Sequence, residues 1–291
     1  MISFFPSSFG RLHDCLYFCG RFLTAMNNNE TVRLADVSIG YRTRQGVRTV
    51  MQGITAGIRQ GELTCLLGRN GAGKSTLLRT LAAFQPGLAG KIFVDGRPLQ
   101  EYSAKELAQR IGVVLTERPD VQQMTVWQLV AMGRSPYTGF WGKLNSDDEQ
   151  VVNEAVSQVG ITALADRLVT TLSDGERQKV MIAKALAQQT GIIYLDEPTA
   201  FLDYPSKVDT LLLLRRICRE QQKTVFLSTH DLELALQVAD RLWLMQTDGS
   251  LAIGAPRELA DSGVLTRFIE EDSGVAFDVA TLSIRIKKGT E

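Results

Sequence analysis

The sequence predicts an α/β protein with a parallel sheet and a helical insertion. Short, almost entirely apolar runs at 62–67 and 192–195 have the length of buried strands, and segments with helical spacing separate such runs. Near residues 98–175 the helical pattern prevails. Parallel strands that alternate with helices form a covered sheet, and the loops at the carboxyl ends of its strands form the site. A chain of 291 residues suffices for one large α/β domain or two small ones.

The strands are predicted from apolar runs and from alternation of apolar and polar residues. Alternation over 32–39 is typical of a half-buried strand, and Asp95-Gly96 and Asp248-Gly249 are tight-turn sequences. In chain order, strands are predicted at 32–39, 47–58, 62–67, 91–94, 111–115, 192–195, 224–228, 242–246 and 251–253, and alternation returns over 277–286.

The helices are predicted from 3.6-residue spacing and from their start and stop signals. Ser103 is a residue type that caps helix N-termini, and Pro86 with Gly87 and Gly90 ends the helix that follows the glycine-rich segment. Helices are predicted at 75–83, 104–110, 125–132, 147–159, 177–189, 205–221 and 232–239.

We expect three regions along the chain: an N-terminal extension at 1–29, a main domain at 30–255 and a C-terminal extension at 256–291. Residues 1–25 mix aromatic residues with Arg11, Asp14 and Arg21, so they lack the unbroken apolar centre of a signal peptide. Two interpretations stay open for them: a disordered extension, or a misassigned start, with Met26 as the true first residue. The intact mass of the native protein distinguishes the two.

Composition argues against several classes of protein. The 32 basic and 32 acidic residues cancel, so bulk charge gives no support for nucleic-acid binding. No uncharged apolar run approaches the roughly 18 residues that cross a bilayer. The four cysteines show no metal-binding spacing, which favours a reduced, cytoplasmic chain; they are Cys15, Cys19, Cys65 and Cys218.

A phosphate-binding loop follows the predicted strand at 62–67. Its glycines let backbone N–H groups point at an anion, and the helix after it adds its positive N-terminus. Lys74 is placed to reach the β- and γ-phosphates, and the Ser75 hydroxyl is placed to bind Mg²⁺. The nucleotide-binding residues are Gly68, Arg69, Asn70, Gly71, Ala72, Gly73, Lys74, Ser75 and Thr76.

Two adjacent carboxylates end the buried strand at 192–195. Asp196 is placed to hold Mg²⁺, directly or through water. Glu197 is placed to orient or deprotonate an attacking water. The alternative is a structural cap made by Asp196.

These motifs together resemble those of the ATP-binding cassette (ABC) ATPases over about residues 30–255. The resemblance implies a P-loop core with a helical signature subdomain and an antiparallel β subdomain. The segment Leu172-Ser173-Asp174-Gly175-Glu176 is similar to the family signature, usually Leu-Ser-Gly-Gly-Gln. In the family this segment contacts ATP held by the opposite subunit. The resemblance thus implies a homodimer in which Ser173, Asp174, Gly175 and Glu176 face the partner's ATP.

Other family elements match as single residues. By resemblance, Tyr41 stacks on adenine, Asp203 in the segment 199–203 communicates across the dimer, and His230 lies near the γ-phosphate. The catalytic set is then Glu197, His230 and Lys74.

The chain also departs from the family at two motifs. Thr116-Glu117 stands where the family has a Mg²⁺-binding glutamine, and which residue substitutes stays open, with Glu117 a candidate ligand. Asp174 and Glu176 replace a glycine and a glutamine of the signature. Two carboxylates near a triphosphate cost electrostatic energy unless they face helix N–H groups or solvent.

The segment 125–137 resembles the helical subdomain of importer ATPases for iron–siderophore, haem and cobalamin. Phe140 and Trp141 in the glycine-rich loop after it suit a groove that grips a permease. The resemblance implies a peripheral ATPase on the cytoplasmic face of the inner membrane. Its cofactors are ATP and Mg²⁺, and its partners are permease subunits and, indirectly, a periplasmic or lipoprotein substrate-binding protein, without nucleic acid. The alternatives are a soluble ABC-type ATPase of DNA or ribosome processes and a nucleotide-gated regulatory module.

Overall fold

A parallel sheet forms the centre of the protein. The computed structural model describes residues 29–44, 46–116, 121, 123–139, 142–270 and 274–287. Within these ranges the sheet has six strands in the order β10-β9-β3-β8-β7-β6, all parallel except β10. Their bounds are β3 (Leu63–Gly68), β6 (Ile111–Val114), β7 (Ile192–Asp196), β8 (Thr224–Ser228), β9 (Arg241–Met245) and β10 (Leu251–Gly254).

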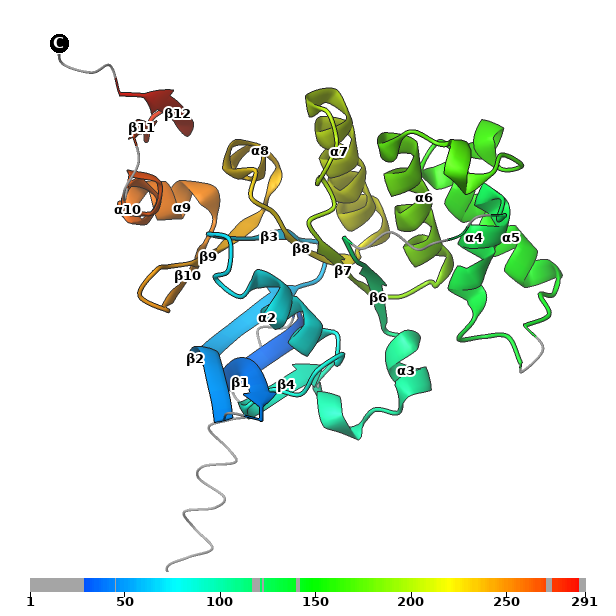
Figure 1. Ribbon diagram of the computed structural model, residues 1–291, viewed down its shortest axis with the longest axis horizontal. Helices are drawn as coiled ribbons and strands as arrows, with labels where there is room; N and C mark the ends of the chain where they lie inside the picture. Colours follow the sequence, from blue (N-terminus) through cyan, green and yellow to red (C-terminus); the bar gives the residue numbers. More distant parts are fainter. Residues whose placement is uncertain are drawn as a thin grey trace, which may run out of the picture.

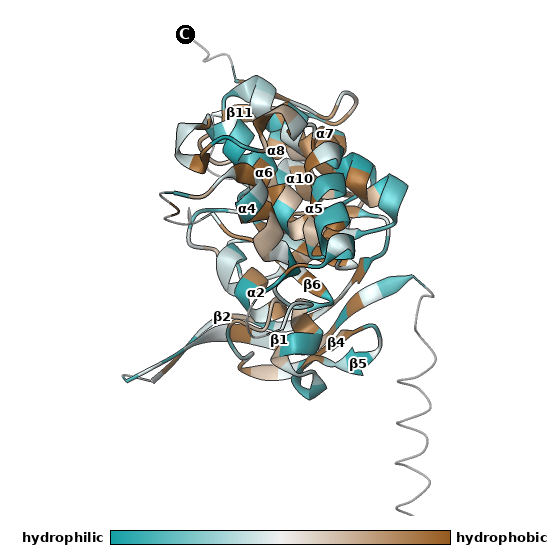
Figure 2. Cartoon of the chain, turned by 90° about the vertical axis from the view of Figure 1, so that its right-hand side faces the viewer, coloured by the Kyte–Doolittle hydropathy of each residue, from teal (hydrophilic) through white to brown (hydrophobic). Residues whose placement is uncertain are grey.

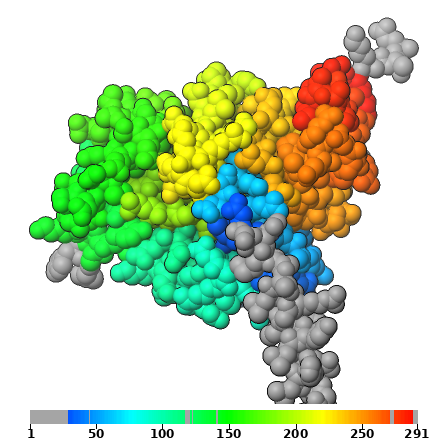
Figure 3. All heavy atoms as spheres, turned by 180° about the vertical axis from the view of Figure 1, so that it is seen from behind, coloured from blue at the N-terminus to red at the C-terminus, as the bar shows by residue number. Residues whose placement is uncertain are grey.

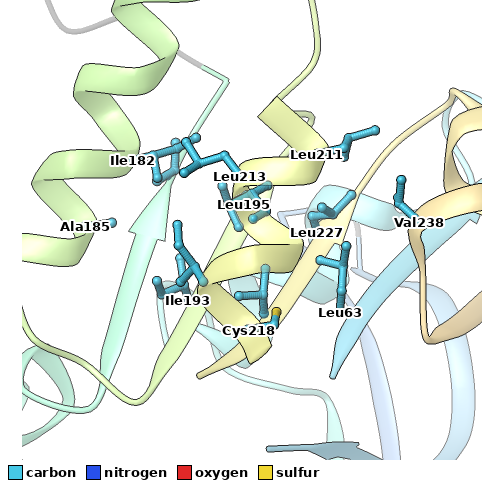
Figure 4. Close-up of a cluster of buried hydrophobic side chains, with 14 of the residues drawn as sticks. Leu63, Ile182, Ala185, Ile193, Leu195, Leu211, Leu213, Cys218, Leu227 and Val238 are labelled. Carbon is cyan, nitrogen blue, oxygen red and sulfur yellow. The ribbon is translucent and has the colours of Figure 1, made fainter. Parts of the chain in front are cut away.

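The two faces of this sheet are buried under different layers, because successive side chains in a strand point to opposite sides. On one face Tyr194, Phe226 and Trp243 pack edge to face, with ring centroids 6.1 and 5.0 Å apart. They belong to a buried cluster with α2 (Lys74–Leu81) and the second sheet. On the other face Ile193, Leu195 and Leu227 pack against α6 (Asp174–Ala187) and α7 (Tyr204–Gln221) (Figure 4). The expected covering of both faces is confirmed.

The second sheet is antiparallel, with four described strands in the order β2-β1-β4-β5. Its strands are β1 (Glu30–Thr43), β2 (Gly46–Arg59), β4 (Ala89–Val94) and β5 (Arg97–Pro98). The expected antiparallel β subdomain is therefore present. The short helices η1 (Leu99–Glu101) and α3 (Ala104–Ala108) lead from it to β6, and Ser103 caps α3 as its residue type predicts.

A helical layer follows β6 in the chain, and Figure 2 shows its apolar positions (brown) packed together above the antiparallel sheet. The strand predicted at 111–115, within the stretch 98–175, is present as β6 and pairs with β7 in the central sheet. The helices of this layer are α4 (Val126–Ala131), η2 (Met132–Arg134), α5 (Ser146–Gln158), η3 (Thr162–Leu164), η4 (Val169–Thr171) and α6 (Asp174–Ala187).

Two further helices, α7 (Tyr204–Gln221) and α8 (Leu232–Val238), cover the central sheet between the helical layer and the C-terminal segment (Figure 1). That segment holds α9 (Pro256–Asp261), α10 (Val264–Glu270), β11 (Val275–Asp278) and β12 (Ser283–Ile286). It lies at the opposite end of the molecule from the helical layer (Figure 3). No helix in the described ranges is both long and apolar enough to span a bilayer.

Candidate functional site

The glycine-rich segment 68–73 forms a turn between β3 and α2. Gly71 and Gly73 have φ of +82° and +104°, values that favour glycine. A Cβ at Gly73 would lie 2.2 Å from Cγ1 of Val50, so a side chain there would displace β2. Lys74 begins α2, is 6% exposed, and donates from Nζ to the carbonyl oxygen of Gly68 at 2.9 Å. The loop thus has the close turn and the helix N-terminus expected of a phosphate cradle.

The β7 strand ends at Asp196, directly beside this loop. Its Oδ1 accepts hydrogen bonds from Oγ of Ser75 at 3.2 Å and from Oγ of Ser228 at 2.7 Å. A hydroxyl and a carboxylate oxygen side by side are the hard ligands that Mg²⁺ prefers. Among the described residues no three His, Cys, Asp or Glu side chains gather as a metal cage.

Glu197 lies between the side chains of Lys74 and His230. Its backbone has φ of +48°, which costs about 1–3 kcal/mol for a residue other than glycine. Its N–H donates to Oγ of Ser228 at 2.9 Å. Its Oε1 lies 3.9 Å from Nζ of Lys74, and its Oε2 lies 3.6 Å from Nδ1 of His230. The three residues expected to be catalytic therefore meet at the carboxyl ends of β7 and β8.

Ser228 is a site residue that sequence reasoning missed. Its hydroxyl accepts from the backbone of Glu197 and donates to the side chain of Asp196, so it fixes both carboxylates relative to β8. A serine at the end of an apolar strand has no distinctive spacing. The order of parallel strands, which places β8 beside β7, is what gives Ser228 this role.

Tyr41 and Asp203 lie at the edges of this cluster. The Tyr41 hydroxyl bonds with Oγ1 of Thr76 in the first turn of α2, and the Tyr41 residue is 43% exposed. Tyr41 thus lies at the edge of the phosphate loop. Asp203 caps α7 by accepting from the N–H of Ser206 at 3.2 Å. Hydrogen bonding from Ser206 holds the pKa of Asp203 below its ordinary value.

The signature-like segment begins α6 in the helical layer. Ser173 is the N-cap: its Oγ accepts from the N–H of Glu176 at 3.3 Å and donates to Oε2 of Glu176 at 2.9 Å. The N–H of Ser173 donates to the same oxygen at 2.8 Å. These bonds lower the pKa of Glu176. Asp174 lies 4.0 Å from Nη1 of Arg177. Gly175 is half-buried beside Ser206 of α7.

The start of α6 also faces the catalytic cluster within one copy of the chain. Asp174 and Arg177 line a small cavity of about 30 Å³ together with Thr116 and Glu197. The Thr116 hydroxyl donates to the backbone oxygen of Asp196 at 2.6 Å. Glu117, the other candidate substitute for the family glutamine, lies outside the described residues, as do Phe140, Trp141 and residues 1–28.

The family is decided by a comparison of the whole sequence with family models. The model of the ABC transporter family matches residues 51–200, which span the phosphate loop, the signature-like turn and the paired carboxylates. The chain belongs to the ABC transporter family. As a member it is an ATP-binding, ATP-hydrolysing subunit, and the expected family and fold are confirmed.

Several characterised proteins are similar to this ABC subunit over most of their length. The ferric enterobactin transport ATP-binding protein FepC of Escherichia coli is 39% identical over 236 residues, 81% of this chain and 86% of that protein. The hemin import ATP-binding protein HmuV of Streptomyces coelicolor is 38% identical over 235 residues, 80% and 82% of the two chains. A solved metal-chelate type ABC transporter, in an inward-facing conformation, aligns with a TM-score of 0.71 at 30% identity, over 83% of this chain and 90% of that one.

Proposed function

We propose that two copies of this chain bind two ATP molecules at a shared interface and so drive an importer for an iron–siderophore, haem or cobalamin cargo. The observation that carries the proposal is that Lys74, Asp196, Glu197 and His230 meet at one edge of the sheet. ATP hydrolysis needs groups that bind the phosphates, hold Mg²⁺, accept the proton of water and keep that acceptor in place. Relatives named for enterobactin and hemin transport favour this cargo class.

Each residue then has a definite task. The N–H groups of 71–76 and the ammonium of Lys74 bind the β- and γ-phosphates. Ser75 and Asp196 hold Mg²⁺, which when bound neutralises charge on the phosphates. Glu197 accepts a hydrogen bond from the attacking water and takes its proton, while His230 holds the carboxylate in place. Tyr41 stacks on the adenine.

The signature turn supplies the remaining contacts from the other copy. Ser173 is placed at the N-terminus of α6, where a hydroxyl, the N–H of Gly175 and the helix dipole all favour an anion. Within one copy, Ser173 belongs to the helical layer and the phosphate loop to the central sheet. A second copy placed face to face completes each site, and Asp203 lies between the two sites.

A groove between the subdomains suits the membrane partner. It has a volume of about 410 Å³ and mostly apolar walls that include Phe84, Met132, Pro136 and Leu107. Phe84 is 59% exposed and Met132 is 45% exposed. Exposed apolar patches of this kind mark interaction sites. We propose that a permease segment docks here, which would place the chain on the cytoplasmic face of the inner membrane. A substrate-binding protein would act only through the permease, and nucleic acid has no part.

Steady-state phosphate release by the chain copurified with its permease tests this function. Glu197→Gln should keep ATP binding and lower turnover at least about 100-fold, because it removes the proton acceptor. Glu220→Gln, on the exposed end of α7, is the matched control and should keep full activity. Turnover near the wild-type rate in Glu197→Gln would refute the assigned role. Absent turnover in the wild type, with and without permease, would favour a regulatory module.

A further inference from the structure

Phe201 is an exposed aromatic residue beside the catalytic cluster. It lies four positions after Glu197 and two before Asp203, and it is 73% exposed. Its backbone has φ of +64°, so the loop is held in a conformation that phenylalanine rarely adopts. Phenylalanine is among the residues most often buried in folded proteins, and strained backbone gathers at functional sites. Both features indicate that this loop presents Phe201 to a partner.

A cavity with several apolar wall residues borders the same cluster. It has a volume of about 300 Å³ and is bordered by the phosphate loop at Gly68 and Asn70, and by His230. Leu67, Leu232, Met245 and Phe268 contribute apolar side chains to its wall, and Arg69 and Thr247 contribute polar ones. An apolar cavity of about 150 Å³ accepts a benzene ring in another protein, so this one has room for a phenyl group.

The C-terminal segment supplies one wall of this cavity. Phe268 belongs to α10, whose Leu265 and Ile269 are buried against the main core. The end of α10 is tied to the terminal hairpin, because Oε1 of Glu270 accepts from the N–H of Phe277 at 3.0 Å and its Oε2 lies 3.1 Å from Nζ of Lys287. The wall formed by Phe268 is therefore fixed in position.

We propose that Phe201 of one copy inserts into this cavity of the second copy, and that the C-terminal segment is thereby part of the ATP-dependent interface. The proposal rests on the shared-site function above. In a two-fold symmetric dimer, if surface i contacts surface j, then j contacts i. Phe201 and the cavity flank the same carboxylate, since His230 lines the cavity and lies 3.6 Å from Glu197. A face-to-face pairing over the two carboxylates therefore brings each Phe201 toward the opposite cavity.

The contact is of the kind that anchors protein interfaces. Buried aromatic residues seated in pockets contribute much of the binding energy, whereas rim contacts contribute little. The cavity is continuous with the phosphate loop, which the partner's signature turn must approach. Nucleotide binding and insertion of Phe201 would then occur together, and the C-terminal segment would contact the second copy only in the ATP-bound dimer.

Photo-crosslinking tests the contact directly. The full chain carrying Glu197→Gln and a benzophenone amino acid at position 201 is irradiated with Mg²⁺ and ATP, or with ADP. We expect ATP-dependent crosslinked dimers whose crosslinks map to peptides containing His230, Met245 or Phe268. Crosslinks that join position 201 to any other region, or a dimer that forms without crosslinks, would overturn the proposal.

Light scattering on variants of the same Glu197→Gln chain gives a second readout. Phe201→Ala should weaken the ATP-dependent dimer about tenfold or more, as expected for a lost aromatic anchor, while Phe201→Trp should largely retain it. Leu212→Ala, which removes a 49% exposed side chain on α7, is the matched control and should leave dimerisation unchanged. Equal dimerisation of Phe201→Ala and Leu212→Ala would contradict the proposal.

The two readouts separate this inference from the function on which it rests. If the parent chain binds ATP and stays monomeric, the shared site is wrong and the inference falls with it. If the Glu197→Gln chain dimerises with ATP but Phe201 lies outside the cavity of the second copy, only the inference fails.

Discussion

The two acidic residues at the start of α6 differ in how the structure neutralises them. Oε2 of Glu176 accepts from both the N–H and the hydroxyl of Ser173, so its charge is used to complete the helix cap. Asp174 has a 43% exposed side chain and lies 4.0 Å from Arg177, which is a weak, screened pairing. Asp174 is therefore the carboxylate that would repel a triphosphate from a second copy.

Removing the charge of Asp174 should tighten ATP-dependent dimerisation. We expect Asp174→Asn to lower the dissociation constant of the ATP-bound dimer roughly three- to tenfold at low salt, with a smaller gain at high salt because charges at this distance are screened. Asp174→Gly should act in the same direction. Asp209→Asn, an exposed site on α7, is the control. Light scattering of chains that also carry Glu197→Gln measures the effect, and unchanged or weaker dimerisation would count against it.

Single residues were predictable where a motif fixes both type and spacing. The positions of Lys74, Asp196, Glu197 and His230 followed from such motifs, and the structure brings them together. Ser228 and Val50 were not predictable, because their roles arise from which strands lie side by side. Nothing in a local pattern shows that Val50 of β2 closes over Gly73.

At the scale of elements, Arg134 joins the helices of the helical layer. Its Nε donates to Oδ1 of Asp148 in α5 at 2.9 Å, and its Nη1 donates to the carbonyl of Ala187 at the end of α6 at 2.9 Å. Its guanidinium also lies 4.0 Å from the ring centre of Tyr137. The side chains of Arg134 and Asp148 are each only 7% exposed. This gives a structural reason for the arginine in the stretch that resembles importer ATPases.

Breaking this buried pair should destabilise the helical layer. Arg134→Ala should lower the free energy of unfolding by about 3–5 kcal/mol, because it leaves Asp148 buried without its counter-charge. Hydrogen exchange of peptides from α5 and α6 should accelerate more than exchange in the central sheet. Arg216→Ala, which removes an exposed bond to the carbonyl of Gln158, should cost less than about 0.5 kcal/mol. If the peptides of α5 and α6 exchanged hydrogen equally fast in Arg134→Ala and Arg216→Ala, the stabilising role of Arg134 would be contradicted.

The same pair predicts a pH dependence. The hydrogen bond from Arg134 first, and then that from the backbone of Asn145, holds the pKa of Asp148 below its ordinary 3.8. A depressed acid pKa in the folded state stabilises the fold above the unfolded-state pKa, and this contribution is lost as pH falls through the folded-state pKa. The stability gap between wild type and Asp148→Asn should therefore be constant from about pH 7 to 5 and shrink below about pH 4. A gap that persists at lower pH would contradict the depressed pKa.

Most elements with strong periodicity were predicted within about two residues, but β1 continues four residues beyond the predicted strand at 32–39, and α6 begins three residues before the predicted helix at 177–189. Short elements at the C-terminus were not predicted. Alternation over 277–286 suggested one continuous strand. The structure has the hairpin β11–β12 instead, because Leu282 with φ of +53° turns the chain between them. The helices α9 and α10, of six and seven residues, were not predicted from the sequence.

At the scale of the whole molecule, the proposed nucleotide site takes its two halves from different layers of the chain. The phosphate loop and paired carboxylates belong to the central sheet, and Ser173 belongs to the helical layer. The resemblance to the ABC family predicts this division. The position of the C-terminal segment beside His230 is visible only in the folded structure, since no sequence motif connects Phe268 to His230.

The mass of the Glu197→Gln chain in solution tests the shared site most directly. With ATP we predict a species of twice the 32.1 kDa of one chain, holding two nucleotides, whereas ADP should leave a single chain. Lys74→Ala in the same background should stay monomeric because it no longer binds the phosphates. A species of 32.1 kDa that binds ATP tightly and never pairs would contradict a site shared between two copies.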